Sequence, residues 1–112
     1  SYEQIPEYTD PAPDDTSQPK ITGVTVLRAS SGAKLRVVFN QTINGNYDNG
    51  ATQISGIDKR LSFITDYDSE GGLTDNVLIL TVMDGAISIP EGSHTLTIVL
   101  YDGNRLTFDF TV

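Results

Sequence analysis

The last eight residues, RLTFDFTV at 105–112, carry the pattern that decides the fold. Large apolar side chains alternate strictly with polar ones, so that Leu106, Phe108, Phe110 and Val112 share one parity. Successive side chains of a β-strand point to opposite faces of the sheet. The alternation therefore predicts a strand with one face buried on a core and one face in solvent, as antiparallel sheets commonly have.

The segments before this stretch repeat the same texture. Runs rich in Val, Ile, Leu, Thr and Phe are separated by clusters of Gly, Asn, Asp and Ser, without helical periodicity between them. Candidate strands cover residues 21–29, 33–40, 51–55, 59–66, 76–83, 93–101 and 104–112, and a shorter extended piece covers 86–89. About seven short strands of this kind predict an all-β fold, an antiparallel β-sandwich.

Two details of these strands need tertiary information. In the first strand Val24 and Val26 share a face, whereas Ile21 and Leu27 have the opposite parity, so the strand switches sheets or is buried on both sides. In the final hairpin, core residues should face core residues.

That rule places Leu100 beside Leu106 and continues in steps of two along both strands. It leaves a three-residue loop at 102–104, with Asn104 in the left-handed conformation that Asn tolerates.

Residues 1–19 differ from the rest of the chain. They contain four of the five prolines and five acidic residues, but no basic residue. Such a composition cannot bury enough apolar surface to offset the entropy of ordering. We expect a disordered, acidic, Pro-rich leader over 1–19 that acts as an extended tether, followed by one folded domain over 20–112.

Composition also excludes several classes of function. The formal net charge of −8 disfavours binding to nucleic acid and to anionic membrane surfaces. The chain has no Cys, which removes disulfides, thiolate metal sites and a Cys nucleophile. No apolar run approaches the ~20 residues that span a bilayer. The sequence does not determine the oligomeric state.

The acidic leader, the segment PKITGVTVLRASSGAKLRVVFN at 19–40 and the final hairpin LTIVLYDGNRLTFDFTV at 96–112 together carry a family resemblance. They resemble the small immunoglobulin-like or fibronectin-III-like modules of secreted, Bacteroidetes-type surface lipoproteins. The resemblance implies an immunoglobulin-like sandwich in an extracytoplasmic location, either secreted or anchored at the cell surface. Contact with a membrane would come only through a removed N-terminal lipid anchor, and the family supplies no fixed functional residues.

One candidate metal site lies in the segment that follows the fourth expected strand. Asp66, Asp68 and Glu70 alternate and are followed by Gly, and Asp75 lies nearby, which is a pattern that can wrap a hard cation such as calcium. Val77 occupies the position where an EF-hand loop carries its closing Glu. The alternative is a solvated Gly-rich loop, with no cofactor at all.

A candidate ligand site surrounds the aromatic ring at position 47. Asn46, Tyr47 and Asp48 combine a ring that can stack on a sugar with side chains that can bond its hydroxyl groups. Tyr67 belongs to this candidate site, and Tyr101 would join if it lies at the same end. The alternative is a flexible turn, because Asn and Gly tolerate positive φ.

No enzyme is predicted. His94 is the single imidazole, and its neighbours lack the arrangement that a catalytic base requires. We expect a non-catalytic accessory or spacer module of an extracytoplasmic surface protein. The alternative is a carbohydrate- or protein-binding (adhesion) module that uses its end loops to contact an extracellular glycan or a surface protein.

Overall fold

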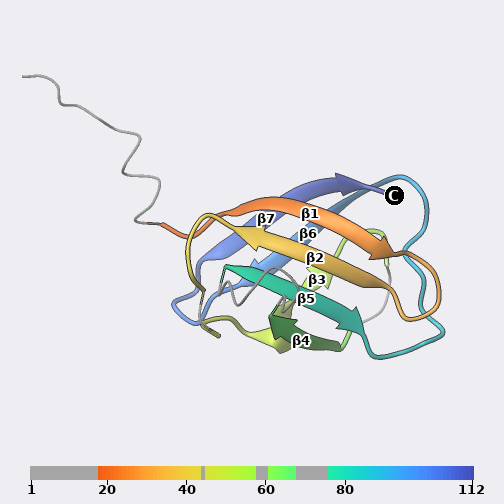
Figure 1. Cartoon of the computed structure of the whole chain (residues 1–112), viewed down its shortest axis with the longest axis horizontal. Coiled ribbons are helices and arrows are strands. Elements are labelled where there is room, and N and C mark those ends of the chain that lie inside the picture. Colours follow the sequence, from red (N-terminus) through yellow and green to blue (C-terminus); the bar gives the residue numbers. More distant parts are fainter. Residues whose placement is uncertain (1–17, 44, 58–60, 68–75) are drawn as a thin grey trace, which may run out of the picture.

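The computed structural model describes residues 18–43, 45–57, 61–67 and 76–112, with only the backbone described for 64–67. Within them, two antiparallel sheets face each other as a β-sandwich (Figure 1). One sheet has the strand order β1-β2-β5-β4, and the other has the order β3-β6-β7. The elements are β1 (Ile21–Arg28), β2 (Lys34–Phe39), the 3-10 helix η3 (Asn49–Ala51), β3 (Gln53–Ile54), β4 (Phe63–Tyr67), β5 (Val77–Val82), β6 (Ser93–Val99) and β7 (Arg105–Thr111). The predicted all-β sandwich is confirmed at this level.

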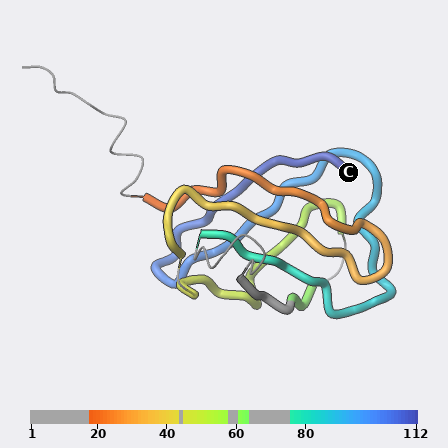
Figure 2. Tube along the Cα trace, in the orientation of Figure 1, coloured from red at the N-terminus to blue at the C-terminus, as the bar shows by residue number. Residues whose placement is uncertain are grey.

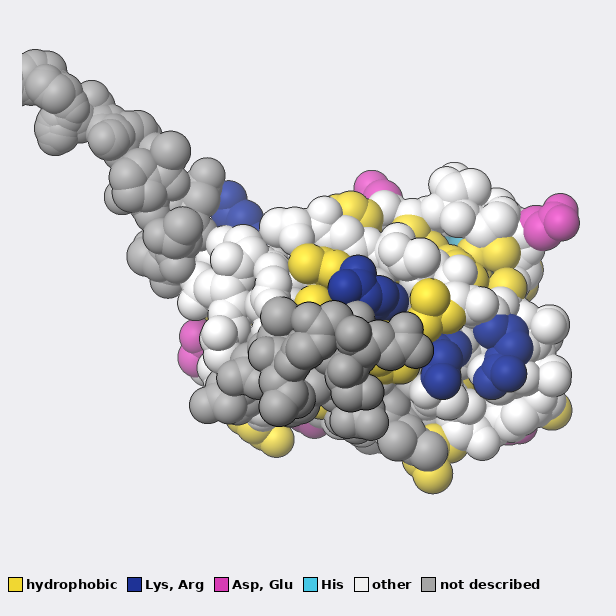
Figure 3. All heavy atoms as spheres, viewed as in Figure 1, with side chains coloured by type: hydrophobic (Ala, Val, Ile, Leu, Met, Phe, Trp, Pro, Cys, Tyr) yellow, Lys and Arg dark blue, Asp and Glu magenta, His cyan; other side chains and the backbone are white. Residues whose placement is uncertain are grey.

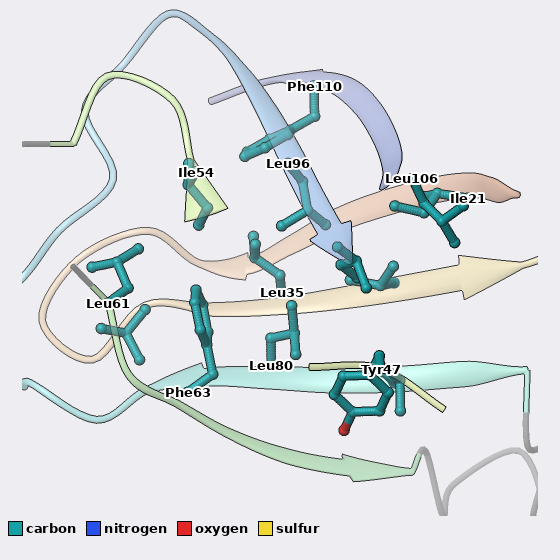
Figure 4. Packing of buried hydrophobic residues seen from close by; sticks show 14 of the residues in the cluster. Ile21, Leu35, Tyr47, Ile54, Leu61, Phe63, Leu80, Leu96, Leu106 and Phe110 are labelled. Atoms are coloured by element: carbon teal, nitrogen blue, oxygen red, sulfur yellow. The ribbon is translucent and has the colours of Figure 1, made fainter. Parts of the chain in front are cut away.

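The core lies between the two sheets and is built by alternate residues of each strand. Leu35, Val37 and Phe39 on β2 are all buried, because their shared parity directs them inward. Figure 4 shows how Leu80 from the same sheet and Leu96 from the opposite sheet enter one cluster of buried side chains. Burial of this apolar surface is the main favourable term that holds the layers together.

Three predicted strand segments differ from the strands of the structure. The segment 51–55 contains only the two-residue β3, because η3 occupies its start. The segment 86–89 is not a strand, although Ile87 and Ile89 are both buried and the Ile89 N–H donates to the Ala29 carbonyl. Within the segment 59–66, β4 begins at Phe63, and residues 58–60 lie outside the described part.

Two irregularities in the pairing of β1 with β2 explain the mixed parity of the first strand. Ile21 pairs with Phe39, but the next pair joins Gly23 to Val38, so one extra residue of β1 is inserted between them. Such a bulge shifts the alternation of side chains by one residue. Ile21 and Val24 therefore both point toward the core, although their positions have opposite parity. A second shift leaves Leu27 unpaired and exposed. The strand neither switches sheets nor is buried on both faces.

The register predicted for the final hairpin is wrong by two residues. Ile98, not Leu100, pairs with Leu106, and the loop spans 100–104. A shift of two keeps every core side chain on the core face, so the hydrophobic pattern cannot distinguish the two registers. The longer loop forms because the left-handed position is taken by Gly103, at φ 95, and not by Asn104.

The entry of the chain into the domain is fixed by one side chain. The Lys20 N–H donates to Asn40 Oδ1 at 2.8 Å, and Asn40 Nδ2 donates to the Gln18 carbonyl at 3.0 Å. The Asn40 N–H also donates to the Lys20 carbonyl at 3.0 Å. The expected leader over 1–19 otherwise lies outside the described residues, which begin at Gln18.

Candidate functional site

The ring predicted to stack on a sugar belongs to the core. Tyr47 is only 9% exposed and is part of the buried cluster (Figure 4). A ring in this position cannot offer its face to a ligand in solvent. The prediction of Tyr47 as a stacking platform is therefore wrong in this respect, although Asn46 and Asp48 beside it are exposed.

The loop around Tyr47 is tied to the body of the sandwich. Asp48 caps η3 by accepting from the Gly50 N–H at 3.1 Å, and its own N–H donates to the Val99 carbonyl of β6 at 2.8 Å. Asn49 Nδ2 donates to the Phe63 carbonyl of β4 at 2.8 Å. These bonds link both sheets through η3: the Asn49 side chain reaches β4, and the Asp48 backbone reaches β6. The Asp48 side chain caps η3, so these polar residues have structural roles in the loop.

The candidate calcium loop cannot be built from the described residues. Asp68, Glu70 and Asp75 lie outside them, and Asp66 and Tyr67 are described only as backbone positions at the end of β4. Among the residues whose side chains are described, no group of three or more acidic, His or Cys side chains is placed to hold a metal. The described part also contains no helix that could cross a membrane.

His94 is a structural residue that sequence reasoning did not recognise as such. Its ring is 6% exposed and packs against Phe110 with the ring centroids 5.6 Å apart. Nδ1 lies 2.7 Å from the Ser55 carbonyl oxygen and Nε2 lies 2.6 Å from the Pro90 carbonyl oxygen. Both ring nitrogens are therefore occupied by backbone groups, and neither is available to a substrate. Gly56, at φ 83, keeps this space open, because a Cβ there would approach the ring within 3.2 Å.

Two open hollows lie on the described surface. One, of about 310 Å³, separates the start of β1 from the start of β7, and its charged lining residues are Lys20 and Arg105. The other, of about 250 Å³, lies over His94 and includes Asp109. Enzyme pockets enclose most of a ligand's surface between converging polar groups. The second hollow also has serine and threonine hydroxyl groups in its lining, but both His94 ring nitrogens are bonded to backbone carbonyl oxygens and Asp109 accepts from Thr95. His94 is therefore not paired with a hydroxyl nucleophile or with Asp109.

The charges of the described residues are unevenly distributed. Arg28, Lys34 and Arg36 project from the outer side of β1 and β2, and Figure 3 shows the basic side chains over these strands with acidic ones near the outline of the molecule. Arg28 uses its guanidinium to bond the Gly32 carbonyl at 3.1 and 3.2 Å. The Arg28 side chain therefore helps to hold the turn between β1 and β2.

One exposed aromatic residue lies at a loop end. Tyr101 is 71% exposed in the turn between β6 and β7. The turn is held by a bond from the Leu100 N–H to the Asn104 carbonyl at 2.8 Å and by a bond from the Asn104 N–H to Asp102 Oδ1 at 2.9 Å. Of the tyrosines whose side chains are described, Tyr101 is therefore the one that solvent can reach. The sequence analysis predicts Tyr101 only as a contributor to a candidate site around Tyr47.

No known family model, curated protein or solved structure matches the chain. Its function is therefore inferred from its own geometry and chemistry.

Proposed function

We propose that this chain is a non-catalytic, immunoglobulin-like module that serves as a rigid spacer in an extracytoplasmic surface protein. The observation that carries the proposal is the course of the chain through the sandwich. β1 and β7 run side by side in the same direction, so the chain enters at one end and leaves at the other (Figures 1 and 2). A module with this geometry separates its point of entry from its point of exit by the full length of a strand.

The order of the strands supports the immunoglobulin-like part of the proposal. Constant-type immunoglobulin domains place strands A, B, E and D in one sheet and C, F and G in the other. Lettering the seven described strands in chain order turns β1-β2-β5-β4 into A-B-E-D and β3-β6-β7 into C-F-G. Neighbours within both sheets therefore agree with that arrangement, strand by strand.

His94 supports the same assignment. Many immunoglobulin-like domains have a Tyr near the start of strand F whose hydroxyl bonds to the backbone a few residues upstream. His94 is the second residue of β6, the strand equivalent to F, and its Nε2 lies 2.6 Å from the carbonyl of Pro90, four residues upstream. The His94 imidazole therefore holds the segment before β6 against the start of that strand, as the tyrosine does before strand F in those domains.

The junction with the leader suits a spacer. Three hydrogen bonds to Asn40 fix the backbone at Gln18 and Lys20, so the joint between leader and domain is not a free hinge. The acidic, Pro-rich composition of residues 1–19 favours an extended tether. We place the module outside the cytoplasm as part of this proposal, held away from its anchor by that tether.

A ligand screen tests the proposal. The purified chain is passed over a broad glycan panel and a set of extracellular proteins, and polysaccharides incubated with it are assayed for released products. A spacer should give no saturable binding and no products. Release of products would overturn the non-catalytic claim.

Saturable binding would contradict the spacer function. If that binding disappeared in Tyr101→Ala while the fold remained intact, the alternative of an adhesion module that binds through an end loop would replace it. Tyr101 is the matched choice because it is exposed and its ring contributes nothing to the buried cluster.

A further inference from the structure

We infer that the free edge of β7 is a self-complementary interface through which two copies of this chain pair. The sandwich leaves four edge strands among the described residues: β1 and β4 in one sheet, β3 and β7 in the other. Unpaired backbone groups on such an edge are a template for another strand. The four edges differ in how well they could serve as that template.

Of these edges, β7 is the longest regular one. β1 has two register shifts, which twist an edge away from pairing, and β3 is only two residues long. β4 has five residues, whereas β7 has seven and pairs with β6 in an unbroken register. No proline interrupts β7 to remove a donor from its edge.

The hydrogen-bond pattern shows which backbone groups of β7 point outward. Gly92 and Val112 exchange both of their backbone bonds, and the Leu100 N–H donates to the Asn104 carbonyl. Bonded pairs recur at every second residue in an antiparallel ladder. The even-numbered residues of β7 therefore bond to β6, and the odd-numbered ones present their N–H and C=O groups to the free edge: Arg105, Thr107, Asp109 and Thr111.

These four residues carry opposite charges in a symmetric arrangement. Arg105 and Asp109 each lie two residues from Thr107, and all three side chains are exposed on the outer face of the sheet. If two β7 strands pair antiparallel around a two-fold axis at Thr107, each Arg105 lies directly opposite the Asp109 of the other copy. Opposite charges in directly facing positions favour pairing, whereas like charges oppose it.

The two side chains are available for this contact. Among the described residues, the Arg105 guanidinium has no hydrogen-bond partner. Asp109 accepts from Thr95 Oγ1 at 2.7 Å through Oδ1, which fixes the carboxylate and leaves Oδ2 for a cation. The pairing would join β3-β6-β7 of two copies into one continuous sheet, with about six new backbone hydrogen bonds.

Charge exchange provides the first test. We measure the mass of the chain by sedimentation equilibrium up to about 1 mM, where even a weak interface is populated. The native chain should dimerise reversibly, and Arg105→Asp and Asp109→Arg should each remain monomeric because like charges then face each other twice. An equimolar mixture of these two variants should dimerise again, since every facing pair becomes opposite in charge. Glu91→Arg, which changes the charge as Asp109→Arg does but lies outside β7, should dimerise like the native chain.

A crosslinking test fixes the register. The chain has no Cys, so a disulfide can form only at an introduced one. Facing Cα atoms in a bonded antiparallel pair are about 5.5 Å apart, within disulfide range. Thr107→Cys should therefore oxidise to a covalent dimer. Thr97→Cys should not, because Thr97 lies beside Thr107 on the same outer face but on the central strand β6.

Three results would overturn the inference: a native chain that stays monomeric at the highest concentration, single-charge variants that dimerise like the native chain, or a variant mixture that fails to recover dimers. Equal crosslinking at both introduced cysteines would also contradict it. Circular dichroism of each variant confirms that the fold is retained, so that loss of dimer is not confused with unfolding.

Discussion

Two tetrapeptides of the same composition occur in different loops and have opposite structural roles. Residues 47–50 are Tyr-Asp-Asn-Gly, and residues 101–104 are Tyr-Asp-Gly-Asn. In both, the Asp side chain accepts from the N–H two residues later, at 3.1 Å in the first and 2.9 Å in the second. Yet Tyr47 is 9% exposed and Tyr101 is 71% exposed.

The difference arises from what surrounds each turn. The first turn lies between the sheets and is bonded to β4 and β6, so its ring completes the core. The second joins two adjacent strands of one sheet at the end of the sandwich, where Tyr101 stays exposed among the described residues. Local chemistry therefore sets the turn, and the topology decides whether its aromatic residue stabilises the fold or faces solvent.

The largest expected effect comes from removing the buried ring. Tyr47→Ala should lower the free energy of unfolding by about 3–5 kcal/mol, the usual cost of deleting a buried aromatic side chain. Tyr47→Phe keeps the ring and should cost no more than about 1 kcal/mol, the most that the net value of one typical hydrogen bond would add. Urea denaturation of both variants checks this. Equal and small losses would mean that the ring does not belong to the core.

A smaller effect should follow from changing the backbone of the exposed turn. Gly103→Ala places a side chain at φ 95 with no atom within 4 Å of the added Cβ, so the cost comes from the backbone alone. We expect a loss of about 1–2 kcal/mol. Gly85→Ala is the matched control, because Gly85 has equally open space without positive φ, and should change the stability by less than about 0.5 kcal/mol. A three-residue loop with Asn104 in the left-handed position predicts the opposite, a tolerant Gly103.

The smallest effect is expected for the exposed ring. Tyr101→Ala should change the free energy of unfolding by less than about 0.5 kcal/mol, as surface substitutions usually do. Thermal unfolding of this variant beside Tyr47→Ala makes the contrast direct. A loss comparable to that of Tyr47→Ala would show that the two turns do not differ in the way described.

The difference between local chemistry and topology also explains how much of the fold can be predicted from the sequence. Alternation places Leu35, Val37 and Phe39 inward because parity is a local property of a strand. It leaves the hairpin register uncertain by two residues, since a shift of two preserves parity. The alternation does not predict the bulge after Ile21. An inserted residue reverses which face the neighbouring side chains point to, but it leaves no mark in the composition of the strand.

The candidate sites were harder to predict for a related reason. Asn46, Tyr47 and Asp48 have the composition of an adaptable binding loop, but composition does not report what packs over a loop. His94 is bonded to Ser55, thirty-nine residues away, a contact that no local pattern encodes. The acidic residues proposed as calcium ligands remain a prediction, because Asp68, Glu70 and Asp75 lie outside the described part of the chain.

The central claim, a rigid spacer with its two ends at opposite ends of the sandwich, is tested most directly by one distance measurement. Spin labels are attached to cysteines introduced at Gln18 and Thr111, which are exposed and lie near the entry and exit of the domain. In dilute solution the account predicts a single narrow distance distribution at about 25–35 Å, from roughly 3.3 Å per residue along β1 and β7. A broad distribution, or one centred well below that range, would contradict it.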